Sequence, residues 1–206
     1  MAETIPINFP IPQETAITSY PYSDIREGTG IVRFRGVRLQ IDNNSANDVY
    51  SLVTDSGIVS VKDGATVVTS GSSLDFDVTF NTPKIIDGNC IIYIPIYWTT
   101  AGAAATITPK VTVIHYDGSS ETTLLAQTTF QTGTGSIATA DEWGLRVDIP
   151  RTHFKICETL RFTIEFATGG AAATYYLFHI PGASSTTYFP LGGGALSFFV
   201  PFRLDL

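Results

Sequence analysis

The sequence predicts an all-β fold: an antiparallel β-sandwich organised as an eight-stranded jelly roll, with an extended N-terminal arm and an extra C-terminal edge strand. From residue 31 onward, apolar residues alternate with polar ones, and β-branched and aromatic residues dominate, which is typical of half-buried strands. A loop sequence that occurs twice indicates how the strands are grouped. We therefore divide the 206 residues into an arm over residues 1–30 and a single sandwich domain over residues 31–206.

The arm is defined by prolines interleaved with large apolar side chains. Four of the chain's 11 prolines fall in residues 1–30, and proline prevents a regular hydrogen-bonded ladder. An extended segment this apolar is expected to lie along a protein surface, either of its own domain or of a neighbouring subunit. Its candidate interface residues are Ile5, Ile7, Phe9, Ile11, Tyr20 and Tyr22.

Eight segments are assigned to the jelly roll and two further strands to its sheet edges. The alternation is clear at 74–80 and 160–166, where each strand would bury one face and expose the other to water. The dipeptides Asp87-Gly88 and Asp117-Gly118 are typical of turns between strands. The eight segments are 58–69, 74–80, 91–98, 106–116, 123–131, 144–149, 160–166 and 174–181, and the edge additions are 31–41 and the run that starts at Leu196.

The repeated loop reads Thr-Ala-Gly-Ala-Ala-Ala-Thr over residues 100–106 and Thr-Gly-Gly-Ala-Ala-Ala-Thr over residues 168–174. In both places the loop follows a strand of eight residues, which itself follows a turn-rich connection and an alternating strand. Coincidence in a chain rich in Thr and Ala is one explanation. Two related units of four strands are the other, and two such Greek-key units facing each other would make an eight-stranded jelly roll.

Composition and charge exclude several classes of protein. The formal net charge is −7, with 12 basic and 19 acidic side chains, so the chain repels phosphate and nucleic acid is not expected as a partner. The apolar runs are far shorter than the ~20 residues needed to span a bilayer, and no secretory signal is visible, so we expect neither a membrane partner nor secretion. Cys90 and Cys157 are expected to be buried thiols in a protein made in a cytoplasm, not a disulfide.

No catalytic, cofactor-binding or metal-binding motif can be identified. The three histidines do not stand at metal-ligand spacings, and His115 and His179 are expected to pack inside strands. A nucleophile elbow and a phosphate-binding loop are also missing from the sequence. Asp75 and Asp77 would project from one strand face about 7 Å apart. That separation suits the acid pair of a glycosidase, but solvation of a polar strand face explains it better, so we expect no enzyme activity and no cofactor.

Contact with other proteins is the function that these features favour. The C-terminal strand is apolar on both faces, and such a strand at a sheet edge promotes aggregation unless it is covered. The arginines near the start of the domain are expected to orient contacts by pairing with carboxylates. Trp143 is the large aromatic residue most favoured to be exposed, where it could stack on a sugar. The candidate interface residues outside the arm are Arg33, Arg35, Arg38, Phe198, Phe199 and Phe202.

With its proline-punctuated arm (Ile5 to Pro12), its doubled four-strand pattern and its lack of catalytic motifs, the chain resembles the jelly-roll structural proteins of virus particles. These include capsid proteins and the decoration or vertex proteins of phage-like virions. The resemblance implies a non-enzymatic decoration or minor capsid protein of a virion, made in the host cytoplasm. It also implies a homo-oligomer, a trimer or higher ring, that binds other capsid proteins through the arm and terminal strand. The alternatives are a shell-forming capsid protein and a carbohydrate-binding or receptor-binding module that uses Trp143.

Overall fold

The part of the chain that the structure describes is all-β. The computed structural model describes residues 29–39, 49–54, 65–100, 103–135, 138–178 and 194–203. Within these ranges there are twelve strands and no helix, and thus no helix that could cross a membrane. Residues 1–28 of the predicted arm, with its six candidate interface residues, lie outside them.

The bounds of the strands agree with most of the predicted segments. Residues 58–64 and 179–181 of the predicted strands lie outside the described ranges. The strands are β1 (Thr29–Leu39), β2 (Val49–Val53), β3 (Ala65–Val68), β4 (Ser73–Thr79), β5 (Lys84–Thr100), β6 (Ala105–Tyr116), β7 (Glu121–Thr129), β8 (Gly133–Gly135), β9 (Ala138–Phe154), β10 (Thr159–Gly170), β11 (Ala173–Phe178) and β12 (Ser197–Arg203).

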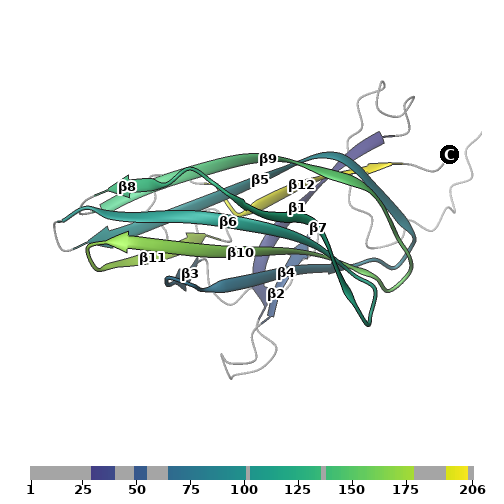
Figure 1. Cartoon of the computed structure of the whole chain (residues 1–206), viewed down its shortest axis with the longest axis horizontal. Helices are drawn as coiled ribbons and strands as arrows, with labels where there is room; N and C mark the ends of the chain where they lie inside the picture. The colour runs from purple at the N-terminus through teal and green to yellow at the C-terminus, as the bar shows by residue number, and fades with distance from the viewer. Residues whose placement is uncertain are drawn as a thin grey trace, which may run out of the picture.

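These strands form one large mixed sheet. Hydrogen-bonded neighbours follow the order β3-β11-β5-β12-β1-β2-β4-β10-β6-β7, while β9 pairs with β5 and β8 pairs with β6. The described pairs are antiparallel except for β2 and β4, which run parallel and meet at Ser51 and Asp77. The long strands β5, β6, β9 and β10 extend along the long axis of the molecule (Figure 1).

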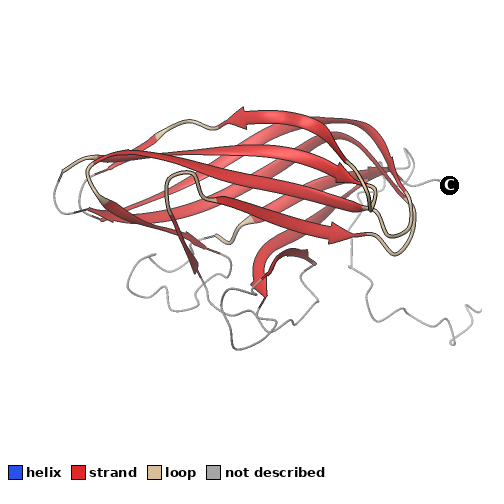
Figure 2. Ribbon diagram, turned by 60° about the horizontal axis from the view of Figure 1, so that its bottom comes forward, coloured by secondary structure: helices blue, strands red, loops and turns tan. Residues whose placement is uncertain are grey.

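Phenylalanine rings from separate parts of the sheet meet in the core. The ring centroid of Phe198 on β12 lies 4.7 Å from that of Phe162 on β10 and 5.8 Å from that of Phe76 on β4. Because β12 is not hydrogen-bonded to β10 or β4, these rings meet across the interior and not along one layer. The sheet therefore folds over on itself into a sandwich-like structure (Figure 2), in which each strand turns alternate side chains inward.

The two strands assigned to sheet edges are interior strands, so that part of the prediction is wrong. β12 lies between β5 and β1, and β1 lies between β12 and β2. Phe198 is fully buried and Phe202 is 6 % exposed, because both face the chain's own core. The apolar character of the terminal strand is thus explained by burial inside the domain, without a neighbouring subunit.

The eight strands assigned to the jelly roll pair in two groups of four, β3-β11-β5-β9 and β4-β10-β6-β7. In chain order the first four of these strands are β3, β4, β5 and β6, and the last four are β7, β9, β10 and β11. Each pair between two strands has an equivalent pair when every strand is replaced by its counterpart in the other set; for example, β5 with β9 corresponds to β10 with β4. This symmetry is expected for two related units. The two repeated loops also touch, because the Ala171 N–H donates to the Ala104 carbonyl at 3.0 Å. β12, β1 and β2 join the two groups into one sheet, so the eight-stranded jelly roll stays a prediction.

One predicted turn is a β-bulge. The backbone of β5 continues through Asp87-Gly88, and its register against β9 shifts between Ile86 and Gly88. Gly88 has a φ of 111°, which glycine adopts without strain, so the Asp-Gly signal marks an irregular point inside a strand. Asp117-Gly118 does turn the chain between β6 and β7, where the Asp117 N–H donates to the Ser120 carbonyl at 3.1 Å.

Candidate functional site

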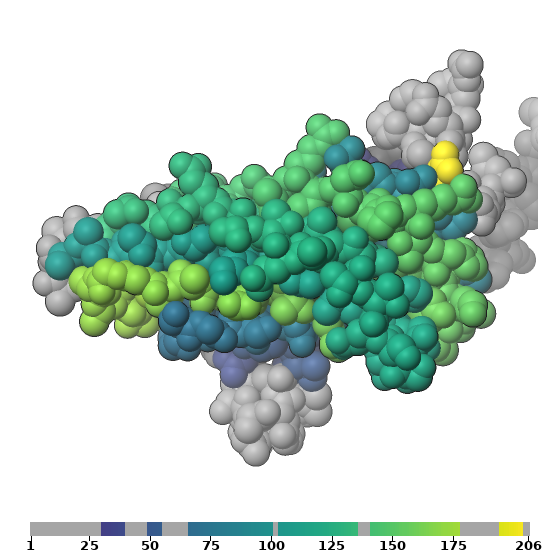
Figure 3. Space-filling model, viewed as in Figure 1, coloured from purple at the N-terminus to yellow at the C-terminus, as the bar shows by residue number. Residues whose placement is uncertain are grey.

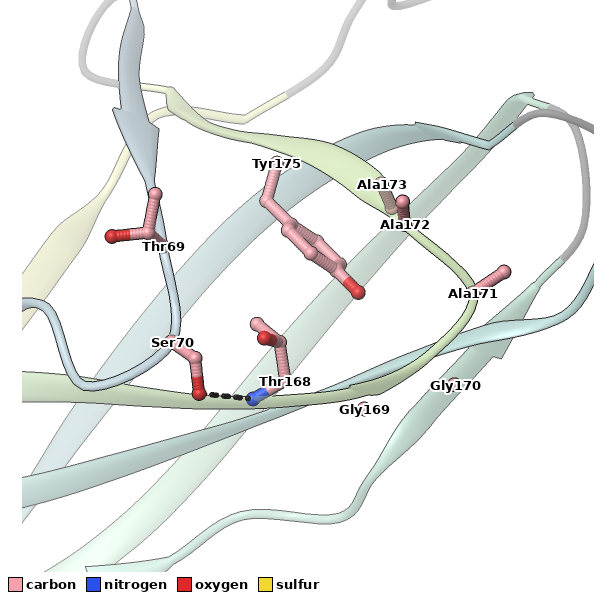
Figure 4. Close-up of a pocket in the computed structure, with 9 residues that line it drawn as sticks. All are labelled: Thr69, Ser70, Thr168, Gly169, Gly170, Ala171, Ala172, Ala173 and Tyr175. Carbon is pink, nitrogen blue, oxygen red and sulfur yellow. Dashed lines mark hydrogen bonds between the residues drawn. The ribbon is translucent and has the colours of Figure 1, made fainter.

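A pocket of about 480 Å³ opens between two turns of the sandwich. One wall is the β3–β4 turn with Thr69 and Ser70, and the other is residues 168–173, which are the end of β10, the β10–β11 turn and the start of β11. Tyr175 on β11 lies between the two walls (Figure 4). The turns are neighbours on the molecular surface (Figure 3) because β3 pairs with β11.

Hydroxyl and backbone groups form the polar part of the pocket. Ser70 Oγ accepts a hydrogen bond of 3.4 Å from the Thr168 N–H and so bridges the two turns (Figure 4). The Thr69 N–H donates to Ser72 Oγ at 2.9 Å, and the hydroxyl oxygens of these two residues are 2.8 Å apart. These bonds fix the shape of the β3–β4 turn, since short side chains that bind the backbone stabilise turns.

Tyr175 presents a fixed aromatic ring to the pocket. It is 3 % exposed, and its hydroxyl donates to the Thr106 carbonyl at 2.8 Å. The ring also lies against Trp98, with 6.2 Å between the centroids. Burial raises the pKa of the Tyr175 hydroxyl, because a low-dielectric surrounding disfavours the phenolate. The residue therefore stays neutral and cannot turn away from the pocket without losing its hydrogen bond.

The β10–β11 turn consists of small residues because another segment packs closely against it. Gly170 has a φ of 78°, and a Cβ added there would lie 2.5 Å from the Ala104 carbonyl oxygen. Contact between the two repeated loops therefore requires glycine at this position. Ala171, Ala172 and Ala173 continue the turn, and their methyl groups leave the pocket open.

The lining is suited to a neutral ligand. Every described lining residue is uncharged at neutral pH, so the pocket offers a phosphate or carboxylate no countercharge. Its hydroxyl and backbone groups can bind amide, ester or hydroxyl groups, and its methyl groups and the Tyr175 ring can contact apolar parts. The described lining residues include no His, Cys, Asp or Glu.

The sequence does not predict this pocket. Residues 168–174 stand out in it only as a repeated loop, and Thr69 and Ser70 have no predicted role. The two walls are 98 residues apart where Ser70 meets Thr168, and the pairing of β3 with β11 and of β4 with β10 brings them together. The repeat was the one signal that pointed to this region.

His115 and Glu158 form a close pair that fastens a turn. His115 Nε2 and Glu158 Oε2 are 2.7 Å apart, and Oε2 also accepts the Lys155 N–H at 2.8 Å. The bond from Lys155, together with the one to His115, lowers the pKa of Glu158. The His115 ring lies 4.3 Å from the Phe154 ring, so its predicted packing role is confirmed, whereas His179 lies outside the described ranges.

Asp75 and Asp77, considered above as an acid pair, are bound by an arginine. Arg161 Nε lies 2.7 Å from Asp77 Oδ1 and Arg161 Nη2 lies 2.9 Å from Asp77 Oδ2. Its Nη1 lies 2.6 Å from Glu121 Oε1 and 3.9 Å from Asp75 Oδ2. These carboxylates raise the pKa of Arg161 and keep it charged. The cluster is an ion-pair network on a sheet surface, in which Arg161 contacts both aspartates.

The prediction of an exposed Trp143 is wrong. Trp143 is 7 % exposed and stacks on Trp98, with 6.3 Å between centroids and 16° between planes. A ring enclosed in this way cannot stack on a sugar. Both cysteines are free: Cys90 is buried, and burial raises its pKa to about 12, whereas Cys157 is exposed, contrary to expectation. Among the described residues no cluster of His, Cys, Asp or Glu could hold a metal ion.

The predicted interface residues separate into two groups. Phe198 and Phe202 are buried in the core of the chain. Arg33 is exposed, donates to Ser197 Oγ at 3.1 Å, and has its guanidinium carbon 5.7 Å from the centre of the Phe199 ring. Phe199 is half-buried, as are two further predicted residues, Arg35 and Arg38.

Comparison with known proteins gives similarity of fold only. No family model matches the chain, and no curated protein matches it. A CocE/NonD family hydrolase from Staphylococcus aureus matches with a TM-score of 0.50 and 11 % identity, over 84 % of this chain and 37 % of the hydrolase. An aminopeptidase from a marine sediment archaeon, Thaumarchaeota archaeon, matches with a TM-score of 0.48 and 8 % identity, over 86 % of this chain and 37 % of the aminopeptidase. The chain thus spans well under half of either enzyme.

A virus particle matches more weakly than these enzymes. The structure of infectious bursal disease virus, Gx strain, matches with a TM-score of 0.24 and 10 % identity, over 86 % of this chain and 56 % of the viral chain. The resemblance to virus structural proteins therefore has a counterpart, but at this TM-score it carries no argument about function or about a location in virions. The expectations of a virion structural protein and of no enzyme activity are contradicted by the higher-scoring match to a hydrolase.

Proposed function

We propose that this chain is the β-sandwich part of a hydrolase. The observation that supports the proposal is the similarity of its fold to the CocE/NonD family hydrolase over 84 % of this chain. Because the chain spans 37 % of that enzyme, a complete hydrolase of this kind would include more protein than the sandwich. In this proposal the eight strands β3 to β7 and β9 to β11 form a jelly roll. The strands β12, β1 and β2 connect its two groups of strands by hydrogen-bonded pairing.

Within that hydrolase, the pocket beside Tyr175 would hold a neutral part of the substrate. Its hydroxyl groups, backbone groups and methyl groups suit an ester or amide flanked by apolar atoms. His115 and the two aspartates are held by Glu158 and Arg161, so the reacting groups would come from residues outside the described ranges or from a neighbouring domain.

Removal of the chain from a native extract tests its place in a hydrolase. Hydrolysis of neutral aryl esters and of aminoacyl anilides is measured before and after depletion with an antibody to the chain, and the purified chain is assayed beside it. Activity that falls on depletion, or activity of the chain alone, supports the proposal. Undiminished activity in the depleted extract, with an inactive purified chain, refutes it.

Two matched variants, each with one alanine replaced by aspartate, test the pocket. Ala172 lines the pocket and Ala126 lies on β7, and both are exposed. We expect neutral ester and amide fragments to give saturation-transfer NMR signals with the chain and with Ala126→Asp. Ala172→Asp should abolish them, because a carboxylate in a neutral pocket must be desolvated when the ligand binds. Equal signals from the two variants, or none from the unmodified chain, would rule out this site.

A further inference from the structure

The outer face of β9, β5, β12 and β1 carries a row of side chains that the proposed function does not use. Cross-strand register aligns Arg146, Ile91, Phe199 and Arg33 in that order, one from each strand. The residues that follow or precede them along the strands face the core, so these four point outward. Ile91 is 44 % exposed, and Arg33 and Arg146 are exposed. We call these four residues the outer row.

The outer row is apolar at its centre and basic at both ends. Arg33 lies over the Phe199 ring, and Ile31, the next outward residue on β1, is 52 % exposed beside Pro201 of β12. Two arginines in one row stand out on a chain with a net charge of −7, and Asp148, two residues after Arg146 on the same face of β9, offsets part of the charge at that end. An apolar centre with a charged rim is the pattern of a contact surface, and the positive rim favours an acidic segment as its occupant.

We propose that residues 17–27 of this chain cover the outer row. This segment leads directly into β1, which begins at Thr29, two residues before Ile31. It combines large apolar residues with acidic ones, and residues 1–28 as a whole carry four acidic side chains and one basic one. The apolar residues of the segment are Ile17, Tyr20, Tyr22 and Ile25, and its acidic residues are Asp24 and Glu27.

The length of the segment is sufficient for this contact. Crossing from β1 to β9 requires three spacings between neighbouring strands, about 15 Å. Eleven extended residues reach about 35 Å, so the segment can pass over all four residues of the outer row while it remains joined to β1. Its apolar side chains would lie on Ile91 and Phe199, and its carboxylates would lie near Arg33 and Arg146. This assigns Tyr20 and Tyr22 of the predicted interface residues to the chain's own surface.

Trypsin provides the test, because Arg26 is the one Lys or Arg in residues 1–28. Cleavage after Arg26 in the full chain is followed by mass spectrometry, and its rate reports how often the segment leaves the surface. Ile91→Glu places a charge under the apolar contact and should speed cleavage by about tenfold or more. Ile156→Glu is the matched control, since Ile156 is 58 % exposed and lies in the turn between β9 and β10, and it should leave the rate within about twofold.

A second pair of variants examines the charges without altering an apolar residue. Arg146→Glu should speed cleavage after Arg26 and make it less sensitive to salt, whereas Arg151→Glu, five residues further along the same strand, should not. Circular dichroism establishes that each variant is folded. Equal rates for Ile91→Glu and Ile156→Glu, together with equal rates for the two arginine variants, would overturn the proposal. Protection that increases with protein concentration would also overturn it, because the segment would then cover a second copy of the chain.

Discussion

Arg161 illustrates how this chain uses its few charged side chains, which are 15 % of its residues. It lies on β10 and binds Asp77 on the neighbouring strand β4 through two hydrogen bonds. Such a bidentate pair fixes both side chains and is stronger than a single contact. At the scale of the residue, the charges of Arg161 and Asp77 stabilise the pairing of β10 with β4. The described residues that line the pocket are uncharged.

We expect Asp77→Asn to lower the free energy of unfolding by about 1 kcal/mol, because a partly exposed pair is screened by water. Glu121→Gln removes a single contact to the same arginine from a side chain that is 50 % exposed. Its cost should be less than about 0.5 kcal/mol. Urea denaturation of the two variants measures the difference. A larger loss for Glu121→Gln than for Asp77→Asn would show that the two-bond geometry is not the stabilising feature.

Glu158 should make the stability of the fold depend on pH in the acid range. Its folded-state pKa lies below its usual value of 4.5, so the carboxylate stabilises the folded state above that pH. This contribution is lost as the pH falls through the folded-state pKa. Between about pH 6 and about pH 3, the Tm of the unmodified chain should therefore fall more steeply than that of Glu158→Gln. Parallel Tm curves for the two proteins would contradict this assignment.

At the scale of the element, local pattern predicts strands and faces but not partners. Alternation of apolar and polar residues predicts the strands at 74–80 and 160–166 correctly. Apolar residues of both strands, Phe76 and Phe162 among them, are buried on the core face. The same pattern could not show that β12 lies inside the sheet or that Gly88 is a bulge, because both depend on which distant strand pairs with it. The pocket was missed for the same reason, since its two walls meet only through tertiary pairing.

The interior position of β12 leads to a contrast between two neighbouring phenylalanines. Phe198 is fully buried and contacts Phe162 and Phe76, whereas Phe199 faces outward and is half-buried. Phe198→Ala should lower the free energy of unfolding by about 3–5 kcal/mol, because it leaves a cavity in the core. Phe199→Ala should cost about 1 kcal/mol or less. Chemical denaturation measures both values, and similar losses would mean that β12 is not an interior strand.

At the scale of the whole molecule, the sandwich is built from two similar halves joined by additional strands. The strands β3 to β6 have the same pattern of pairing partners as their counterparts β7 and β9 to β11, and the repeated loops are hydrogen-bonded to each other. Beside that contact the pocket opens, lined by one of the two loops. A fold of this kind occurs as 37 % of a hydrolase with only 11 % identity, and a shared fold does not by itself assign a function.

The two ends of the chain should therefore respond differently to deletion, although both are apolar in sequence. Every described strand begins at or after Thr29, so removal of residues 1–28 should leave a cooperatively unfolding sandwich whose Tm falls by about 4 °C or less. Removal of residues 197–206 deletes a strand that is hydrogen-bonded on both sides and carries Phe198, Val200 and Phe202 into the core. That variant should lose cooperative unfolding altogether. Calorimetry and amide NMR dispersion distinguish the outcomes, and a folded chain without residues 197–206 would show that β12 is not needed to complete the core.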